Sequence, residues 1–295
     1  MHHASTSTCI CERFRTRCLD NGYDMERAIE LCADAGFDYQ DIDFSHTEPN
    51  LPLAQDNWES WIDRLANLLQ KRSVTVEQTH AHWYRHKNMR SPEEIDWNNE
   101  IIRRSVAAAE RFGKDIAIVA HTNTVYDATG YNRDRSFRMN LDFFRHIGDM
   151  AAKQGNRIAI EVLFPTDNTA FGCCAEDLME LLDRLNDPLF GICWDFGHAN
   201  LAKLDSVQSL KTIGTHLIAT HCQDNYGVLP DIHLLPFYGH IDWQTMMTTL
   251  REIGYRGNID LEPHLFTRTL PKDLQLECCK TAKHIADRLL SYMTP

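Results

Sequence analysis

The stretches Arg157-Ile-Ala-Ile-Glu-Val162 and Phe190-Gly-Ile-Cys-Trp194 decide the fold, because both are short, β-rich and apolar. Between them, residues 175–185 have the amphipathic pattern of a helix. A strand, a helix and a second strand in this order predict a βαβ unit, in which the two strands lie parallel in one sheet. The rest of the chain repeats this alternation.

Eight segments share the strand pattern: Thr8–Arg13, Tyr39–Phe44, Val74–Thr79, Ile116–Ala120, Arg157–Val162, Phe190–Trp194, Leu217–His221 and Asn258–Glu262. Eight segments share the helical pattern: Asp24–Ala35, Trp58–Lys71, Pro92–Phe112, Phe137–Gln154, Ala175–Leu185, Val207–Ile213, Trp243–Ile253 and Lys272–Leu290. This tally predicts an α/β fold, a single (β/α)8 TIM barrel. An open doubly wound sheet is less favoured because its Gly-x-Gly-x-x-Gly fingerprint is absent. No linker or internal repeat marks a boundary, so we expect one domain over residues 1–295.

The composition and charge of the 295-residue chain restrict its class and its partners. Hydrophobic residues make up 43% and charged residues 24%, which is ordinary for a globular protein. The chain contains no apolar run near the ~20 residues of a membrane span, and its N-terminus lacks the pattern of a signal peptide. We therefore expect a cytoplasmic protein without a membrane partner. The net charge of −12 opposes nucleic-acid binding.

The ten cysteines include no Cys-x-x-Cys motif. The adjacent pairs 173/174 and 278/279 are interpreted as buried thiols on helices rather than as a zinc ribbon or a disulfide framework. Cys193 and Cys222 flank strand-end residues, and we expect both to point toward the helices as core residues.

Four consecutive predicted strands end in side chains that can bind a metal: Glu161, Asp195, His221 and Glu262. In a TIM barrel the active site is built at these strand ends. Any one of them alone is readily explained as a satisfied polar group, but four in succession favour a metal site. Three carboxylates and one imidazole form an oxygen-rich set. We expect a divalent ion, Mn²⁺ in the first place, with Mg²⁺, Co²⁺ or Zn²⁺ as alternatives.

Five further residues are candidates for substrate binding: His80, His121, His198, Asp231 and His233. His80 and His121 follow the third and fourth predicted strands. His198 comes three residues after Asp195, and the alternation of Asp231 and His233 lets both aim at one centre. Each has an alternative role as a surface or capping residue. The other histidines considered are assigned to the surface or to structure: His82, His86, His146, His216, His264 and His284.

From Gly22-Tyr-Asp-Met-Glu-Arg-Ala, through Trp194-Asp-Phe-Gly-His-Ala-Asn, to Leu261-Glu-Pro, the chain resembles the xylose isomerase-like TIM-barrel superfamily. This superfamily includes sugar isomerases and epimerases, inosose dehydratase and endonuclease IV. The resemblance covers essentially the whole chain. It implies that the metal-binding quartet of Glu, Asp, His and Glu falls on Glu161, Asp195, His221 and Glu262, with separations like those of ketose 3-epimerases.

The chain departs from the 3-epimerase pattern at positions that hold the sugar. Phe164-Pro-Thr-Asp167 lacks the further Glu expected after the first ligand, and Gln223-Asp-Asn-Tyr-Gly227 lacks the Arg expected after the histidine. His240 stands where relatives often have Gly. These departures leave the identity of the sugar open and do not affect the metal quartet.

The resemblance implies a divalent-metal-dependent sugar or polyol isomerase or epimerase. The ion would stabilise an enediolate. Glu161 and Glu262, on separated strands across the barrel mouth, would be the catalytic acid and base, and His198 would orient a substrate hydroxyl or shuttle a proton. We expect a small sugar or polyol as the partner, and a homo-oligomer is an open alternative.

Three other functions stay open. A dehydratase or lyase acting on a cyclic polyol or keto-sugar would share the enediolate step. A sugar-binding barrel without catalysis would tolerate the loss of one glutamate, and this chain keeps both. An endonuclease IV-like phosphodiesterase is opposed by the charge, although its zinc-ligand types all have counterparts: His80, His121, Glu161, Asp195, His198, His221, Asp231, His233 and Glu262.

Two basic loops raise the question of an anionic substrate. The first contains Arg85, Lys87 and Arg90, and the second contains Arg133, Arg135 and Arg138. Exposed loop charges are ordinary, so a neutral substrate is the default. The alternative is that one arginine forms a forked contact with a phosphate or carboxylate.

Overall fold

The protein is seen in a computed structural model, which describes all residues except 1, 12–23, 85–90, 265, 268–269 and 295. The first of the two basic loops, which contains Arg85, Lys87 and Arg90, lies outside the described residues. So do the last two residues of the predicted strand Thr8–Arg13 and the beginning of the Gly22 motif.

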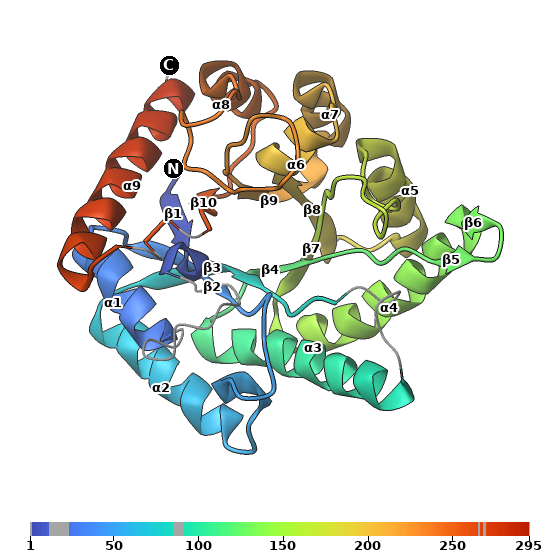
Figure 1. Cartoon of the computed structure of the whole chain (residues 1–295), viewed down its shortest axis with the longest axis horizontal. Helices are drawn as coiled ribbons and strands as arrows, with labels where there is room; N and C mark the ends of the chain where they lie inside the picture. The colour runs from blue at the N-terminus through green and yellow to red at the C-terminus, as the bar shows by residue number, and fades with distance from the viewer. Residues whose placement is uncertain (1, 12–23, 85–90, 265, 268–269, 295) are drawn as a thin grey trace.

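Eight parallel strands form a nearly closed barrel with helices around it (Figure 1), as predicted. The strands, in the order in which they neighbour one another, are β10 (Ile259–Leu261), β1 (Ala4–Ser7), β2 (Tyr39–Asp43), β3 (Thr75–His80), β4 (Ala117–Ala120), β7 (Arg157–Glu161), β8 (Phe190–Asp195) and β9 (Leu217–His221). Backbone contacts close the ring between β9 and β10. The Cys222 amide donates to the Asp260 carbonyl at 2.7 Å, and the Glu262 amide donates to the Cys222 carbonyl at 3.4 Å.

The helices surround the barrel in chain order (Figure 1). They are α1 (Met25–Asp34), α2 (Trp58–Lys71), α3 (Pro92–Phe112), α4 (Arg133–Gln154), α5 (Ala175–Leu185), α6 (Phe196–Leu201), α7 (Ser206–Ile213), α8 (Trp243–Glu252) and α9 (Lys272–Met293). Local signals set several of their ends. Asp24 caps α1 by accepting from the Arg27 amide, and Ser91 caps α3 by accepting from the Glu94 amide. None of the helices in the described part of the chain is long and apolar enough to cross a membrane.

The apolar core has two layers. The larger layer lies between the strands and the helices, and it includes Ile160, Trp194 and Cys222. The smaller layer consists of short side chains inside the barrel: Ala117, Val119, Ala159, Cys193 and Ala219. The prediction for Cys222 is therefore confirmed. The prediction for Cys193 is wrong, because Cys193 and Asp195 are two residues apart on one strand and so point to the same side.

Three local predictions differ from the structure. The first strand is β1 at Ala4–Ser7, whereas Thr8–Cys11, assigned to a strand, forms a 3₁₀ helix. Helix α4 begins at Arg133 rather than Phe137, because Asn132 caps it by accepting from the Arg135 amide. Helix α6 and the short antiparallel pair β5 (Tyr126–Asp127) and β6 (Gly130–Tyr131) were not predicted.

Candidate functional site

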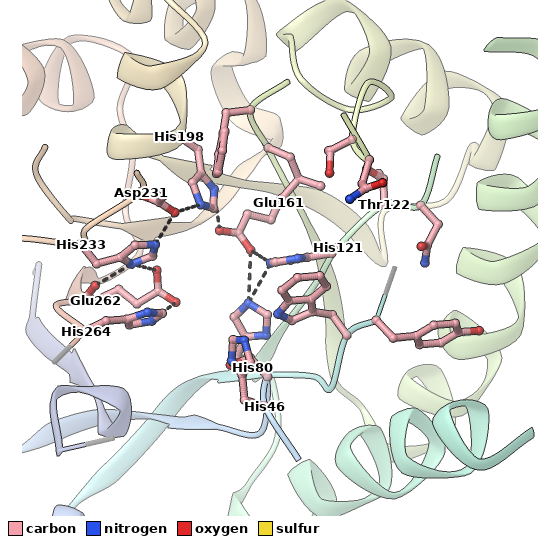
Figure 2. Close-up of a pocket in the computed structure, with 18 of the residues that line it drawn as sticks. His46, His80, His121, Thr122, Glu161, His198, Asp231, His233, Glu262 and His264 are labelled. Carbon is pink, nitrogen blue, oxygen red and sulfur yellow. Dashed lines mark hydrogen bonds and ion pairs between the residues drawn. The ribbon is translucent and has the colours of Figure 1, made fainter. Parts of the chain in front are cut away.

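A cavity of about 310 Å³ opens where the strands end (Figure 2). Its floor carries imidazoles and carboxylates, and its walls carry the aromatic residues Trp83, Tyr84 and Phe164. Uncharged polar side chains such as Asn123 and Asn168 complete the wall. Among the described residues that line this cavity, none is lysine or arginine.

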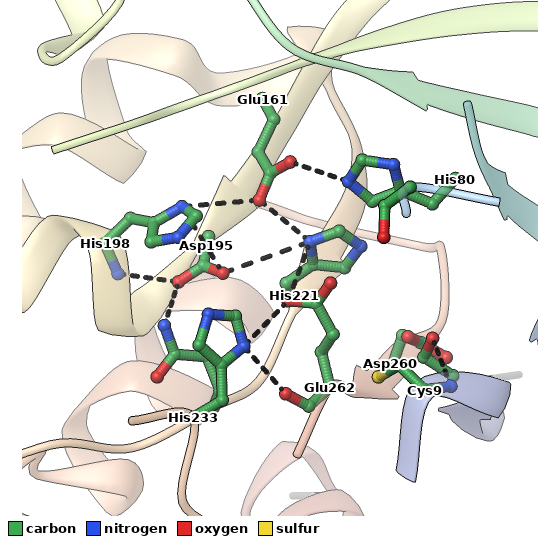
Figure 3. A network of polar contacts seen from close by, with 12 residues as sticks. Cys9, His80, Glu161, Asp195, His198, His221, His233, Asp260 and Glu262 are labelled. Carbon is green, nitrogen blue, oxygen red and sulfur yellow. Dashed lines mark hydrogen bonds and ion pairs between the residues drawn. The ribbon is translucent and has the colours of Figure 1, made fainter. Parts of the chain in front are cut away.

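The predicted metal quartet meets beside this cavity, which Glu161 and Glu262 line. Glu161 ends β7, Asp195 ends β8, His221 ends β9, and Glu262 follows β10. One potential ligand atom from each of the four lies within 4.8 Å of the others. His221 Nδ1 is 2.9 Å from Glu161 Oε1, 3.4 Å from Glu262 Oε2 and 4.0 Å from Asp195 Oδ2 (Figure 3). The sequence prediction therefore corresponds to one compact group of side chains.

The donor set fits a divalent cation. Asp195 Oδ2 and Glu262 Oε2 are buried and have no hydrogen-bond partner. Buried polar atoms normally have one. The imidazole nitrogens near these two oxygens are 3.3 to 4.0 Å away, so both oxygens remain available to a cation. Three carboxylates with one imidazole suit an ion that prefers oxygen ligands.

Histidines balance the acidic groups at this site. Burial opposes ionisation of Glu161, but His121 and His221 outweigh it and hold the pKa of the Glu161 carboxyl well below its usual range. Burial opposes the charge on His221 too, yet the groups around it, Cys193 and then Glu262 and Glu161, raise its pKa well above the ordinary value. Burial raises the pKa of Asp195 to about 7. The site thus mixes charged and readily protonated groups.

A second group of ligand atoms adjoins the quartet at Glu161. His121 Nε2 is 2.6 Å and His80 Nε2 is 3.2 Å from Glu161 Oε2. These three residues also place ligand atoms within 4.8 Å of one another. Glu161 therefore faces the quartet with one oxygen and this histidine pair with the other.

A third group lies on the opposite side of the cavity (Figure 2). Asp231 Oδ2 is 2.8 Å from His233 Nε2 and 3.3 Å from His198 Nε2. His198 Nδ1 lies 3.0 Å from the Val162 carbonyl, which orients the ring. The structure thus brings seven of the nine predicted site residues to the lining of one cavity, and Asp195 and His221 are buried beside Glu161 and Glu262 without lining it. It also permits more than one ion, because the three groups adjoin one another.

Two local features fix Asp195. It is the N-cap of α6 and accepts from the His198 amide through Oδ1 at 2.7 Å. Gln223 Nε2 donates to the same oxygen at 3.0 Å. Gly197 makes this approach possible, because a side chain at that position would overlap the Gln223 carboxamide. Oδ2 of Asp195 is left facing the quartet.

Several cavity residues were missed or misassigned. His264 was assigned to the surface or to structure, but it lines the cavity and stacks on His233 with ring centroids 3.9 Å apart. His46 and Trp83 line the cavity as well, and Trp83 lies 5.0 Å from the His121 ring. All three follow strand-end residues closely in sequence, which is the signal that could have found them. Of the two roles considered for His82, surface or structure, the structure supports the second, because His82 is buried and its Nε2 lies 2.9 Å from Asn98 Oδ1.

The second basic loop does not supply an arginine to the cavity. Arg133 Nη2 is 2.6 Å from Asp177 Oδ1 and 2.6 Å from Glu180 Oε2, both on α5. Arg135 and Arg138 are exposed on the first turns of α4, and neither lines the cavity. The described residues therefore favour the surface interpretation of this loop.

Known structures share the fold at low sequence identity. A D-tagatose 3-epimerase-like protein is 22% identical, covers 98% of this chain and 97% of its own, and has a TM-score of 0.72. The D-allulose 3-epimerase of Methylomonas sp. in complex with D-allulose is 18% identical, with coverage of 99% and 96% and a TM-score of 0.70. The IolI protein with a bound zinc atom is 21% identical, with coverage of 98% and 98% and a TM-score of 0.72.

Two curated proteins match part of the chain. Uncharacterized protein y4fM from Sinorhizobium fredii is 28% identical over 178 residues, which is 57% of this chain and 54% of that protein. Uncharacterized protein MJ1311 from Methanocaldococcus jannaschii is 28% identical over 165 residues, which is 55% of each. The match spans about half the length of these curated relatives. The model of the xylose isomerase-like TIM barrel family matches residues 29–277, so the chain belongs to that family.

Proposed function

We propose that the protein is a divalent-metal-dependent isomerase or epimerase of a sugar or polyol. The observation that carries this proposal is the quartet, in which Glu161 and Glu262 come from strands β7 and β10 and approach one imidazole, that of His221. Two carboxylates beside one bound substrate can remove and return a proton at carbon. Fold neighbours named as a D-tagatose 3-epimerase-like protein and as a D-allulose 3-epimerase support this choice of chemistry.

The roles of the individual residues follow from their positions. Glu161, Asp195, His221 and Glu262 would hold the ion, for which Mn²⁺ is our first choice. When bound, a divalent ion supplies Lewis acidity that stabilises negative charge beside a carbonyl carbon. Glu161 and Glu262 would act as base and acid on the carbon-bound proton.

The remaining site residues would bind and orient the substrate. His198 has its ring fixed by the Val162 carbonyl and faces the cavity, so it suits a contact with a substrate hydroxyl. His80, His121, Asp231 and His233 would bind further hydroxyl groups. Amide and hydroxyl side chains on the wall, without a described lysine or arginine among the lining residues, favour a neutral substrate.

Proton exchange at carbon tests this proposal directly. The Mn²⁺-loaded protein is incubated in D₂O with ketoses, inososes and keto-glycosides, and NMR detects deuterium bound to carbon. We expect exchange with at least one substrate, loss of exchange on chelation, and none in Asp195→Ala. A dehydratase would in addition remove water from the substrate, and any other lyase would cleave it, so mass spectrometry would detect a product of lower mass than the substrate. The absence of any exchange or product across the panel would contradict the proposal.

Phosphodiester hydrolysis is a second candidate, favoured by the two ligand groups that adjoin the quartet: His80, His121 and Glu161, and His198, Asp231 and His233. Chemistry with several ions suits in-line displacement at phosphorus. The test is hydrolysis of a nitrophenyl phosphodiester after loading with Zn²⁺, together with the number of ions bound per chain. Turnover of the diester with several ions, and no exchange at carbon, would favour this candidate.

A further inference from the structure

The two ring nitrogens of His221 face opposite surroundings. Nδ1 faces the carboxylates of Glu161 and Glu262, at 2.9 and 3.4 Å. Nε2 faces Asp41 on β2, whose Oδ2 is 3.8 Å away. His221 and Asp41 are both fully buried, and His221 Nε2 has no hydrogen-bond partner. A buried N–H without an acceptor is costly, so Nε2 needs a partner on this side.

Asp41 is held in place inside the barrel. Gln78 on the neighbouring strand β3 places Nε2 3.5 Å from Asp41 Oδ2 and 3.5 Å from the Thr220 carbonyl of β9. Gln78 thereby links the strand that carries Asp41 to the strand that carries His221. The other carboxylate oxygen, Asp41 Oδ1, is buried without a hydrogen-bond partner.

In the described part of the chain, Asp41 is the acidic residue with a carboxylate oxygen within 4.0 Å of His221 Nε2. Asp260, two residues before Glu262, is also buried inside the barrel, but no contact within 4.0 Å joins it to His221. A shift of about 0.6 Å from the present 3.8 Å would bring Asp41 Oδ2 into hydrogen-bonding range of Nε2, which ends at about 3.2 Å.

We propose that Asp41 is a positioning residue that accepts the Nε2 hydrogen of His221 and so keeps the lone pair of Nδ1 directed at the metal site. A neutral imidazole carries its hydrogen on one nitrogen only, so an acceptor at Nε2 selects the tautomer in which Nδ1 is free to bind a cation. Carboxylates behind ligand histidines orient the ring and strengthen the ligand, and their loss typically weakens metal binding 10–100-fold. The inference rests on the proposed metal site.

Three variants separate this role from a general effect on folding. Asp41→Leu removes the acceptor and keeps the branching at Cγ, whereas Asp41→Asn keeps an acceptor oxygen. Gln40→Leu is the matched control. Gln40 is the adjacent residue on β2, is equally buried, and donates to the Ile29 carbonyl at 3.1 Å on the helix side of the strand. It has no recorded contact with His221.

Zn²⁺ affinity is measured by competition with a chromophoric chelator, and the site is defined as the one lost in Asp195→Ala. We expect affinity to fall roughly 10–100-fold in Asp41→Leu, less in Asp41→Asn, and not at all in Gln40→Leu. In ¹⁵N-histidine spectra of the Zn²⁺-loaded protein, the hydrogen of His221 should reside on Nε2 and exchange faster in Asp41→Leu.

The outcomes distinguish two failures. Equal affinity in Asp41→Leu and the wild type, or a His221 hydrogen on Nδ1, would overturn the role of Asp41 while leaving the metal site standing. Zn²⁺ binding that is unaffected by Asp195→Ala would overturn the metal site itself. An equal loss in Gln40→Leu and Asp41→Leu would show a general effect of burying an apolar group on β2, and would also overturn the inference.

Discussion

Glu161 is the residue on which most of the site converges. Its Oε2 lies 2.6 Å from His121 and 3.2 Å from His80, and its Oε1 lies 2.9 Å from His221 and 3.4 Å from His198. A carboxylate surrounded by imidazoles stays ionised despite complete burial, because the coulombic gain exceeds the desolvation cost. An ionised carboxylate at this position suits a metal ligand.

The first prediction concerns this chemistry. Replacing either glutamate in Glu161→Gln or Glu262→Gln should lower turnover by more than about 10²-fold, the usual scale of general acid–base catalysis. Steady-state kinetics on the best substrate found will measure it, with metal content determined alongside. Glu180→Gln, on the surface of α5, is the control and should leave turnover unchanged. Full turnover in both site variants would move the acid–base chemistry to His198 or His233.

The second prediction concerns pH. Burial opposes the charge on His233, but Asp231 and Glu262 outweigh it and raise the pKa of His233 well above the ordinary value. A raised pKa stabilises the fold fully below the unfolded-state pKa of about 6.5, and the effect is lost as the pH rises through the folded-state pKa. The free energy of unfolding of the metal-free protein should therefore fall as the pH rises above about 6.5.

Asp231→Asn tests the source of this pH dependence. The variant removes the carboxylate 2.8 Å from His233 Nε2, so the pKa of His233 should drop toward its ordinary value and the decline above neutral pH should become shallower. Urea unfolding at several pH values measures the slope. A wild-type slope that persists in Asp231→Asn would assign the pH dependence to other groups.

At the scale of elements, Gly148 lets helix α4 approach strand β8. A Cβ at this position would lie 2.9 Å from Phe190 Cε1 and 3.2 Å from Leu189 Cδ2. Alanine is favoured over glycine by about 1 kcal/mol in a helix interior, so Gly148→Ala would stabilise an isolated α4. In the protein the overlap should dominate, and we expect destabilisation of about 1–3 kcal/mol in chemical denaturation.

A double variant checks this cause. Phe190→Leu shortens the side chain that a Cβ at Gly148 would meet, so adding it to Gly148→Ala should cost less than the sum of the two single changes. Additive losses would show that the contact between α4 and β8 is not what excludes a side chain at residue 148.

The elements that could be predicted residue by residue are those whose signals are local. Helices α2, α3 and α5 have the predicted bounds, because their apolar periodicity is clear. Strand β1 was misplaced because its sequence, Ala4-Ser-Thr-Ser7, is polar although every residue of it is buried. Helix α6 starts directly after Asp195, and such a short helix leaves no periodic signal.

The site residues that could be predicted are those that lie at the ends of strands. Glu161, Asp195 and His221 end their strands, so the closure of the barrel alone brings them together. The sequence signal for His264 is its place two residues after Glu262, but its stack on His233, at 3.9 Å, could not be predicted because it depends on tertiary contacts. Asp41 was missed because it lies within a strand, where an acidic residue gives no sign of facing the barrel interior.

At the scale of the whole molecule, the barrel interior changes character along its axis. Small apolar residues such as Ala159, Cys193 and Ala219 fill one layer, and the acidic and imidazole groups lie toward the carboxyl ends of the strands. The charged side chains inside the barrel therefore lie next to the cavity, where a ligand can reach them. The net charge of −12 adds to the attraction of cations toward this mouth.

The last prediction follows from the separation of the four quartet residues in the sequence. The quartet is spread along the chain from Glu161 to Glu262, at the ends of four different strands. The unfolded chain therefore does not hold the four ligands together, and an ion should bind the native barrel almost exclusively. An ion at 100 times its dissociation constant then adds about 2.7 kcal/mol to the free energy of unfolding. Calorimetry should show a Tm that rises with Mn²⁺ and returns on chelation, whereas Asp195→Ala should not respond. An equal rise in that variant would place the stabilising ion elsewhere, because Asp195 Oδ2 is one of the two buried quartet oxygens that have no hydrogen-bond partner.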